Sequence, residues 1–367
     1  MSGGDQGSQE ELHRFRIYGA VGSYDSTLAV LGGWHVQSAA MLNVGLVGFG
    51  FAGKVFHAPV IRAVQGLHLA AIERRDIEAV LAHKVDLVVI ATPNTSHHPL
   101  AKRCLLAGCH VVVDKPFTTT LAEAEELVAL AKQQRRIVSV YQNRRYVGDF
   151  VTLQQLVEAG SLGRIVFYES HFDRFRPDQK PGAWRERAEP GAGVWFDLGP
   201  HLLDQAFVLF GTPQAIGADI RIERDGGAVD DAFDVTLHYP NLRAELRGSM
   251  LRAAPGPSFS VHGTKGSFIK YGVDAQEAAL KAGRTPGEPN WDADPPELYG
   301  TLTTAEGARP VPTIPSSYTH YYENVRDAIL GTAQLAVTPE WSLDVMRGLE
   351  LAHASSQKRC VLPWRDR

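Results

Sequence analysis

The chain has 367 residues, 44% of them hydrophobic and 21% charged, and its formal net charge is −4. This length exceeds one ordinary compact core, so we expect two domains, and the composition excludes a disordered chain or a fibrous repeat. Because a protein that relies on phosphate contacts with nucleic acid usually has a basic balance, nucleic acid is not an expected partner.

Residues 1–40 differ in character from the rest of the chain. The start, MSGGDQGSQEE, is polar and acidic and lacks the basic region of a secretory signal, so no signal peptide is expected. No steady hydrophobic period follows as far as Ala40. We treat residues 1–40 as an appendage of unknown role (a cloning remnant, an over-long start or a mobile arm) and begin the first domain at Met41.

Strands and helices alternate from residue 41 to residue 147. The run VDLVVIATP, residues 85–93, is typical of a parallel strand buried on both faces. Thr120 with Glu123 forms a capping-box pattern that predicts the start of a helix. The alternation predicts a Rossmann domain with a doubly wound parallel sheet over residues 41–147. Further strands are expected at 42–50, 67–72, 110–116 and 137–142, and helices at 52–64 and 96–107.

The link after the second strand is unexpectedly short. Only Glu73, Arg74 and Arg75 separate LHLAAI from the helical pattern DIEAVLAHK, where a doubly wound domain normally has a helix and a third strand. Either the chain has lost that unit or a segment is absent between these residues. We favour the absent segment, because the rest of the domain looks complete.

The pattern changes after Gly148. Period-two alternation joined by short turns predicts a mostly antiparallel sheet, and residues 272–315, rich in Pro and Gly, are expected to form a long irregular excursion. The chain is therefore expected to combine an α/β domain with an α+β domain over residues 148–367. The strands are expected at 164–172, 215–223, 230–239, 242–251 and 258–263, and the helices at 150–159, 318–330 and 340–357.

The segment Gly48-Phe49-Gly50-Phe51-Ala52-Gly53 fits the pattern GxGxxG between an expected strand and an expected helix. This context indicates a dinucleotide site. The first glycine permits a tight turn, the second lets a pyrophosphate approach, and the third allows the helix to pack closely on the strand. The alternative is a glycine-rich turn that binds no nucleotide.

The residues after the second strand bear on the choice of cofactor. Glu73 lies where an acidic residue would bind the ribose 2′-hydroxyl of NAD, but Arg74 and Arg75 could pair with the 2′-phosphate of NADP. Alternatively, both arginines belong to a solvated loop. We favour NADP, with NAD as the alternative.

Two polar triplets end neighbouring expected strands, Thr92-Pro93-Asn94 and Asp114-Lys115-Pro116. Ligands of open α/β sheets bind beyond these strand ends. The Lys115 ammonium could stabilise a developing alkoxide there, or it could form an ion pair with a neighbouring carboxylate.

Asp197 and His201 are four residues apart, a spacing that places both on one face of a helix. An imidazole can accept an alcohol proton as hydride leaves the carbon, and a neighbouring carboxylate can orient the ring. The alternative is an Asp cap at a helix start with a surface His.

The three cysteines, Cys104, Cys109 and Cys360, are too few for a disulfide framework and favour a reducing, cytoplasmic location. Cys104 and Cys109 lack the partner ligands of a zinc site, so we interpret them as small buried residues and expect no metal ion. No run reaches the roughly 20 apolar residues of a membrane helix, so no membrane partner is expected.

The motifs GFGFAG, ATPN, DKP and DLGPH together resemble the Gfo/Idh/MocA family of oxidoreductases from Met41 to the C-terminus. The segments SVYQNRRY, RFRP, GSFIKYGVDAQEAALKAG and WDADPPELYG are similar to the branch that contains NADP-dependent scyllo-inositol dehydrogenases. This resemblance implies an N-terminal Rossmann domain and a C-terminal domain with a large, mostly antiparallel open sheet. That sheet often forms the subunit interface, which implies a homodimer or a homotetramer.

The resemblance also implies roles for individual residues. The catalytic trio falls on Lys115, Asp197 and His201, while Asp114 stands where the family usually has Glu, so the carboxylate expected near the ribose is carried by a shorter side chain. Residues in segments that line the dinucleotide are Asn94, His97 and Asn143. Candidates for substrate contact, which could equally be packing or domain-interface residues, are Arg174, Trp184, Arg185 and Tyr322.

The expected function is hydride transfer between a nicotinamide cofactor and a secondary alcohol of a polyol, an inositol or a sugar, with a substrate like scyllo-inositol favoured. One alternative is a regulatory protein of the same fold that binds dinucleotide without catalysis. Another is a dehydrogenase for an aldose, a diol or an amino sugar.

Overall fold

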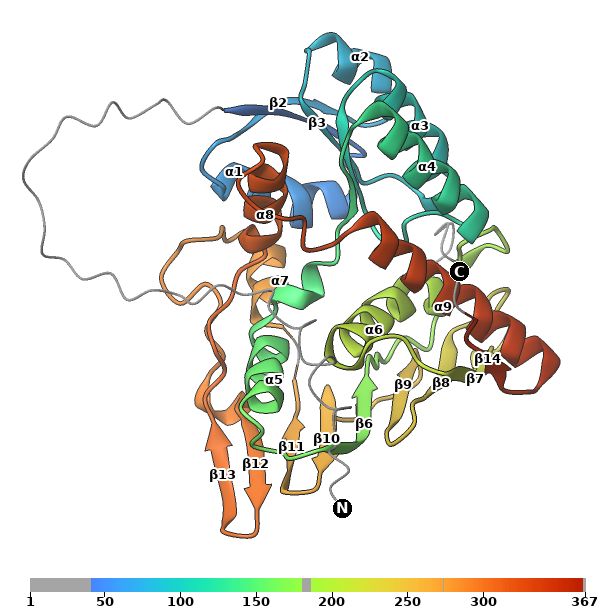
Figure 1. Ribbon diagram of the computed structural model, residues 1–367, viewed down its shortest axis with the longest axis vertical. Helices are drawn as coiled ribbons and strands as arrows, with labels where there is room; N and C mark the ends of the chain where they lie inside the picture. The colour runs from blue at the N-terminus through green and yellow to red at the C-terminus, as the bar shows by residue number, and fades with distance from the viewer. Residues whose placement is uncertain (1–40, 180–185, 273, 366–367) are drawn as a thin grey trace, which may run out of the picture. The chain divides into compact units, whose positions relative to one another are not determined.

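The computed structural model describes residues 41–179, 186–272 and 274–365, which contain two sheets (Figure 1). The first sheet has five parallel strands in the order β2-β1-β3-β4-β5. Its central strands β3 and β4 carry the Val/Ile/Leu runs, and β3 is fully buried, as expected for a sheet covered on both faces. The strands are β1 (Leu42–Val47), β2 (Leu67–Glu73), β3 (Leu87–Ile90), β4 (His110–Val113) and β5 (Val138–Val140).

The helices of this half follow the expected alternation. Thr120 and Glu123 form the predicted capping box at the start of α4, and Cys104 and Cys109 are buried as predicted. The elements are the π-helix η2 (Gly53–His57), α1 (Ala58–Ala63), α2 (Ile77–Ala82), η3 (Asn94–Ser96), α3 (His97–Leu106) and α4 (Leu121–Gln134).

The chain passes directly from β2 into α2. Strand β2 ends at Glu73, and the side chain of Asp76 accepts a hydrogen bond from the backbone N–H of Ala79 to begin the helix. The interpretation that a segment is absent here is therefore wrong. The chain itself lacks the extra helix and strand, and β2 forms one edge of the sheet.

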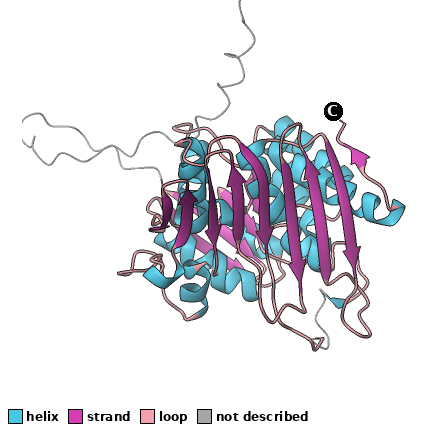
Figure 2. Cartoon of the chain, turned by 90° about the horizontal axis from the view of Figure 1, so that it is seen from below, coloured by secondary structure: helices cyan, strands magenta, loops and turns pink. Residues whose placement is uncertain are grey.

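The second sheet has nine strands in the order β13-β12-β11-β10-β6-β9-β8-β7-β14. Every neighbouring pair is antiparallel except β6 with β9, which confirms a mostly antiparallel open sheet. Figure 2 shows one face of this sheet with the helices lying behind it. The strands are β6 (Ile165–His171), β7 (Ala215–Arg221), β8 (Ala232–His238), β9 (Arg243–Ser249), β10 (Phe259–Gly263), β11 (Gly266–Lys270), β12 (Gly300–Thr304), β13 (Gly307–Val311) and β14 (Leu362–Pro363).

The expectation of an irregular segment at 272–315 is wrong in part. This stretch contains the helix α7 and the hairpin β12–β13. Pro310 disfavours a strand in a sequence, but β13 is an edge strand, where proline is tolerated because its missing N–H faces no neighbour. The helices of this half are η4 (Asn143–Tyr146), α5 (Gly148–Glu158), α6 (Val194–Phe210), α7 (Ala275–Lys281), η6 (Pro296–Leu298), α8 (Thr319–Ile329) and α9 (Pro339–Lys358).

Helix α6 is anchored by a buried ion pair. Asp204 accepts hydrogen bonds from Nε and Nη2 of Arg145 at 2.8 and 2.7 Å, and from the indole N–H of Trp341 at 2.8 Å. These contacts join the middle of α6 to η4 and α9. In the part of the chain that the structure describes, no helix is both long enough and apolar enough to cross a membrane.

The turn from β1 into η2 depends on close backbone contacts. Gly48 has a φ of +101°, and a Cβ atom there would lie 2.3 Å from the carbonyl oxygen of Ala91. A Cβ on Gly53 would lie 2.1 Å from the carbonyl oxygen of Gly48, whereas a Cβ on Gly50 would meet nothing within 4 Å. Two glycines are therefore required by packing, and Gly50 leaves open space above the turn.

This contrast predicts opposite effects of two alanine substitutions. Gly53→Ala forces the Gly48 carbonyl to move and should lower the free energy of unfolding by about 1–3 kcal/mol, the usual cost of overpacking. Gly50→Ala should change it by less than about 0.5 kcal/mol. Urea denaturation of both variants measures the difference, and equal stabilities would contradict this account of the turn.

Candidate active site

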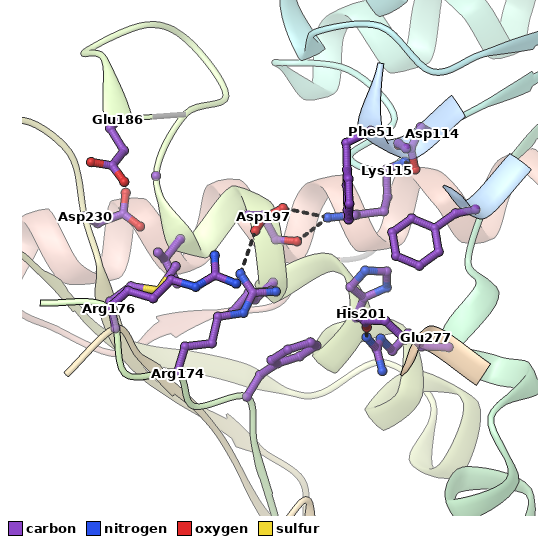
Figure 3. Close-up of a pocket in the computed structure, with 18 of the residues that line it drawn as sticks. Phe51, Asp114, Lys115, Arg174, Arg176, Glu186, Asp197, His201, Asp230 and Glu277 are labelled. Carbon is purple, nitrogen blue, oxygen red and sulfur yellow. Dashed lines mark hydrogen bonds and ion pairs between the residues drawn. The ribbon is translucent and has the colours of Figure 1, made fainter. Parts of the chain in front are cut away.

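A cavity of about 610 Å³ lies where the C-terminal ends of the first sheet's strands meet helix α6 and the second sheet. Figure 3 shows side chains from both halves pointing into it. Phe51 and Ala52 of the glycine turn belong to its wall, so the turn and the cavity adjoin. Predicted site residues in the wall are Phe51, Ala52, Asp114, Lys115, Asn143, Arg174, Asp197 and His201.

Lys115 and Asp197 meet in this cavity. Lys115 follows β4, and its Nζ donates to the backbone oxygen of Asp197 at 2.5 Å and to Oδ1 at 2.9 Å. Both side chains are only slightly exposed, at 13% and 16%. The structure thus brings together two residues that are 82 positions apart in the sequence. Lys115 therefore does form an ion pair with a carboxylate, which was the alternative role for its side chain, and this pair lies inside the cavity.

His201 lies one turn beyond Asp197 on α6 and also lines the cavity. It is 7% exposed, and its Nδ1 has no hydrogen-bond partner among the residues that the structure describes. Burial, together with the charges of Lys115 and Arg144, holds the pKa of His201 well below its ordinary value. The ring is therefore neutral near pH 7 and can accept a proton.

A second cation lies beside this carboxylate. Nη1 of Arg174 lies 3.4 Å from Oδ2 of Asp197, and its guanidinium stacks over the Phe172 ring at 5.0 Å. Burial and the nearby charges of Arg176 and Arg144 lower the pKa of Arg174. Lys115 and Arg174 thus place two cationic groups on the Asp197 side of the cavity, where they could stabilise an oxygen that gains negative charge.

The start of α6 is fixed by Asp230. Oδ2 of Asp230 accepts a hydrogen bond from the backbone N–H of Trp195 at 2.7 Å. The backbone oxygen of Asp230 accepts one from the backbone N–H of Val194 at 2.9 Å. Gly193 has a φ of +90°, and a Cβ there would lie 2.1 Å from Oδ1 of Asp230. Burial raises the pKa of Asp230 to about 6. This carboxylate positions the helix end that carries Asp197.

A second cavity of about 590 Å³ lies beside the glycine turn. Arg74 lines it, whereas Glu73 is not among its lining residues. Lys54 lines it too, and its Nζ lies 5.4 Å from the centre of the Phe49 ring. The wall consists of Phe49, Gly50, Phe51, Lys54, Ile72 and Arg74. Two cations, an open glycine and a helix start are features that suit the phosphates of a dinucleotide.

The residues predicted at the end of β3 mainly hold the strand ends together. Nδ2 of Asn94 donates to the backbone oxygen of Gly191 at 2.7 Å. The buried ring of His97 lies between the backbone oxygens of Pro116 and Thr92, at 2.9 and 3.0 Å. Neither of the two cavities is lined by Thr92, Pro93, Asn94 or His97.

The candidates for substrate contact separate into three groups. Arg174 lines the main cavity. Tyr322 is fully buried, does not line that cavity, and its hydroxyl lies 2.6 Å from Nδ1 of His57. Trp184 and Arg185 lie outside the described residues.

Several residues of the two cavities were missed by sequence reasoning. Lys54 is one residue past the glycine motif, and a basic residue there was a usable signal. Asp230 offered none, because its role depends on a contact with α6 across 35 positions. Arg144 and Glu277 fall in segments that carry the family resemblance, and both line the main cavity.

Comparisons with known proteins identify the family of the chain. Residues 42–142 match the family described as "Oxidoreductase family, NAD-binding Rossmann fold", and residues 154–363 match "Oxidoreductase family, C-terminal alpha/beta domain". The chain is 44% identical to the uncharacterized oxidoreductase YdgJ of Escherichia coli over 342 residues, covering 88% of this chain and 98% of that one.

Two further relatives are similar over most of their length. One is scyllo-inositol 2-dehydrogenase (NADP(+)) IolW of Bacillus subtilis, 37% identical over 88% of this chain and 96% of that one. The other is the solved structure of an oxidoreductase from Bacillus cereus, with a TM-score of 0.81 and 34% identity over 89% of this chain and 99% of that chain. The chain therefore belongs to the Gfo/Idh/MocA oxidoreductase family.

Proposed function

We propose that this oxidoreductase transfers hydride between NADP and a secondary alcohol of a polyol, with an inositol such as scyllo-inositol as the favoured substrate. The observation that carries the proposal is the convergence of Lys115, Asp197 and His201 on a cavity that adjoins the glycine turn. The 37% identity to an NADP-dependent scyllo-inositol dehydrogenase supports the choice of substrate class. In this proposal residues 41–147 hold the dinucleotide and residues 148–367 hold the substrate.

The residues fit the dinucleotide at the glycine turn. Gly50 leaves room for a pyrophosphate, and Lys54 and Arg74 lie where a 2′-phosphate would need cations. Asp114 and Asn143 line the adjoining main cavity, where they would contact the nicotinamide half. When bound, the nicotinamide supplies a hydride acceptor or donor.

The chain's own residues handle the oxygen and its proton. In the oxidative direction the neutral His201 would accept the O–H proton of the substrate while the C–H bond breaks and a C=O bond forms, and a bound nicotinamide would take up the hydride. Lys115 holds the reacting oxygen and stabilises its developing charge. Asp197 keeps the ammonium in place through its backbone oxygen and Oδ1, and its carboxylate would orient the ring of His201 or a substrate hydroxyl.

Location and assembly are also part of the proposal. The open sheet offers a face through which two or four copies could associate, as the family resemblance implies. The described cysteines are free, which is compatible with a reducing cytoplasm.

Replacing the two proposed catalytic groups should abolish most turnover. Lys115→Met should lower kcat by about 10²–10³-fold through loss of oxyanion stabilisation, and His201→Ala by about 10²–10⁴-fold through loss of the base. NAD(P)H absorbance with a panel of inositols, polyols and sugars measures both. The exposed Lys132 and His83 supply the control variants Lys132→Met and His83→Ala. Turnover near the wild-type value in a folded Lys115→Met variant would refute the assignment. If the wild-type protein binds a dinucleotide but turns over no substrate of the panel, the result would favour a regulatory protein.

The pH profile should reflect the lowered pKa of His201. A base must be unprotonated to accept a proton, and a pKa below the ordinary value keeps His201 unprotonated at lower pH. Protonation of His201 should therefore not reduce the rate of oxidation until the pH falls well below 6.5. Because Asp230 also lines the cavity and its pKa is about 6, the profile is compared with that of Asp230→Asn. An acid limb near 6.5 in both proteins would contradict a lowered pKa of His201.

Cofactor choice should depend on Arg74 and not on its neighbour. Arg74→Ala should weaken NADPH binding about tenfold, which corresponds to about 1.4 kcal/mol, and leave NADH binding unchanged. Arg75→Ala is the matched control, because Arg75 is exposed and does not line the second cavity. Fluorescence titration measures both dissociation constants, and an equal effect of the two variants would argue against a 2′-phosphate contact at Arg74.

A further inference from the structure

His57 forms a buried link between the two halves of the molecule. It ends η2, directly behind the glycine turn, and is 0% exposed. Its Nδ1 lies 2.6 Å from the hydroxyl oxygen of Tyr322 in α8. Its Nε2 lies 3.8 Å from Oδ1 of Asp114, and it has no hydrogen-bond partner within the described part of the chain. The imidazole thus stands between a C-terminal helix and the strand end that carries Lys115.

These contacts restrict which nitrogen of the His57 ring can carry a hydrogen. If only Nδ1 were protonated, the lone pair of Nε2 would face the Asp114 carboxylate, and the Tyr322 hydroxyl would have no acceptor among the described residues. If the Tyr322 hydroxyl donates to Nδ1, the hydrogen of the ring sits on Nε2 and points at the carboxylate. A doubly protonated ring also directs an N–H there. In every favourable arrangement Asp114 faces a donor.

Asp114 receives further support at the mouth of the cavity. Its Oδ1 accepts the backbone N–H of Lys115 at 2.9 Å. Burial acts to raise the pKa of Asp114, but His57, Lys115 and His97 outweigh it and hold that pKa well below the usual range. At 3.8 Å the His57 contact is longer than a hydrogen bond, so His57 acts on the carboxylate through its electric field and by filling the space behind it.

We propose that His57, held in one orientation by Tyr322, is a positioning residue that fixes the Asp114 carboxylate for a ribose hydroxyl of the dinucleotide. The inference rests on the proposed function. It explains why Tyr322 is buried away from the cavity. It also gives a reason why Asp114 can replace the glutamate that is usual in the family, because a shorter side chain depends more on the groups that orient it.

Two substitutions of His57 separate its two nitrogens. The amide of His57→Gln places an N–H near the position of Nε2, whereas the amide of His57→Asn reaches only the position of Nδ1. His57→Gln should bind NADPH within about twofold of the wild type, and His57→Asn should bind it about tenfold more weakly, a typical effect of removing an orienting group. Titration of NADPH fluorescence without substrate measures binding directly, independently of turnover.

Tyrosine variants provide a matched test that leaves His57 in place. Tyr322→Phe should weaken NADPH binding about threefold to tenfold, because the ring hydrogen is then free to move to Nδ1. Tyr321→Phe is the control: Tyr321 is a neighbour in α8, is 1% exposed, and donates its hydroxyl to Ser139 instead. The Tyr321→Phe variant also loses a buried hydrogen bond, but it should bind NADPH as tightly as the wild-type protein.

The outcomes are distinct. Wild-type binding by His57→Asn and Tyr322→Phe overturns this inference alone, as does an equal loss in Tyr321→Phe, which would indicate general loosening of α8. Restored binding in His57→Gln together with weak binding in His57→Asn supports it. Failure of the wild-type protein to bind either NADPH or NADH overturns the proposed function and this inference together.

Discussion

The contact on which the site depends is the pair between Lys115 and Asp197. One ammonium makes two hydrogen bonds to one residue, through the backbone oxygen and the carboxylate. The end of a parallel strand supplies the lysine, and the first turn of α6 supplies the aspartate. Because the pair is mostly shielded from water, its attraction is stronger than that of a surface ion pair, and it brings His201 over the same cavity.

The surroundings of this pair have complementary roles. The Arg145–Asp204 pair fixes the middle of α6, and Asp230 fixes its start. Burial lowers the pKa of His201, and the cations Lys115 and Arg174 lie beside Asp197. In the proposed mechanism these groups act as the base and the electrostatic stabiliser for transfer of a hydride and a proton. Family membership identifies the chain as an oxidoreductase, and the proposal assigns its reaction to the cavity that these side chains line.

Features that depend on neighbouring residues could be predicted from the sequence. The capping box at Thr120, the buried strand at 85–93 and the turn at Gly48 each follow from local sterics and hydrogen bonding. Parallel-strand geometry places Lys115 at the carboxyl edge of the first sheet, whereas its convergence with His201 of α6 was implied only by the family resemblance. Contacts made only by tertiary packing could not be predicted: Asp230 at α6, Tyr322 behind His57, and proline in the edge strand β13.

A structure determined with NADPH bound tests the central claim most directly. The account predicts the pyrophosphate above Gly50, the 2′-phosphate near Lys54 and Arg74, and the nicotinamide in the cavity beside Lys115 and His201. A hydride-transfer geometry would leave room for a carbon about 3–3.5 Å from the nicotinamide. A dinucleotide bound elsewhere, or a nicotinamide directed away from Lys115, would contradict it.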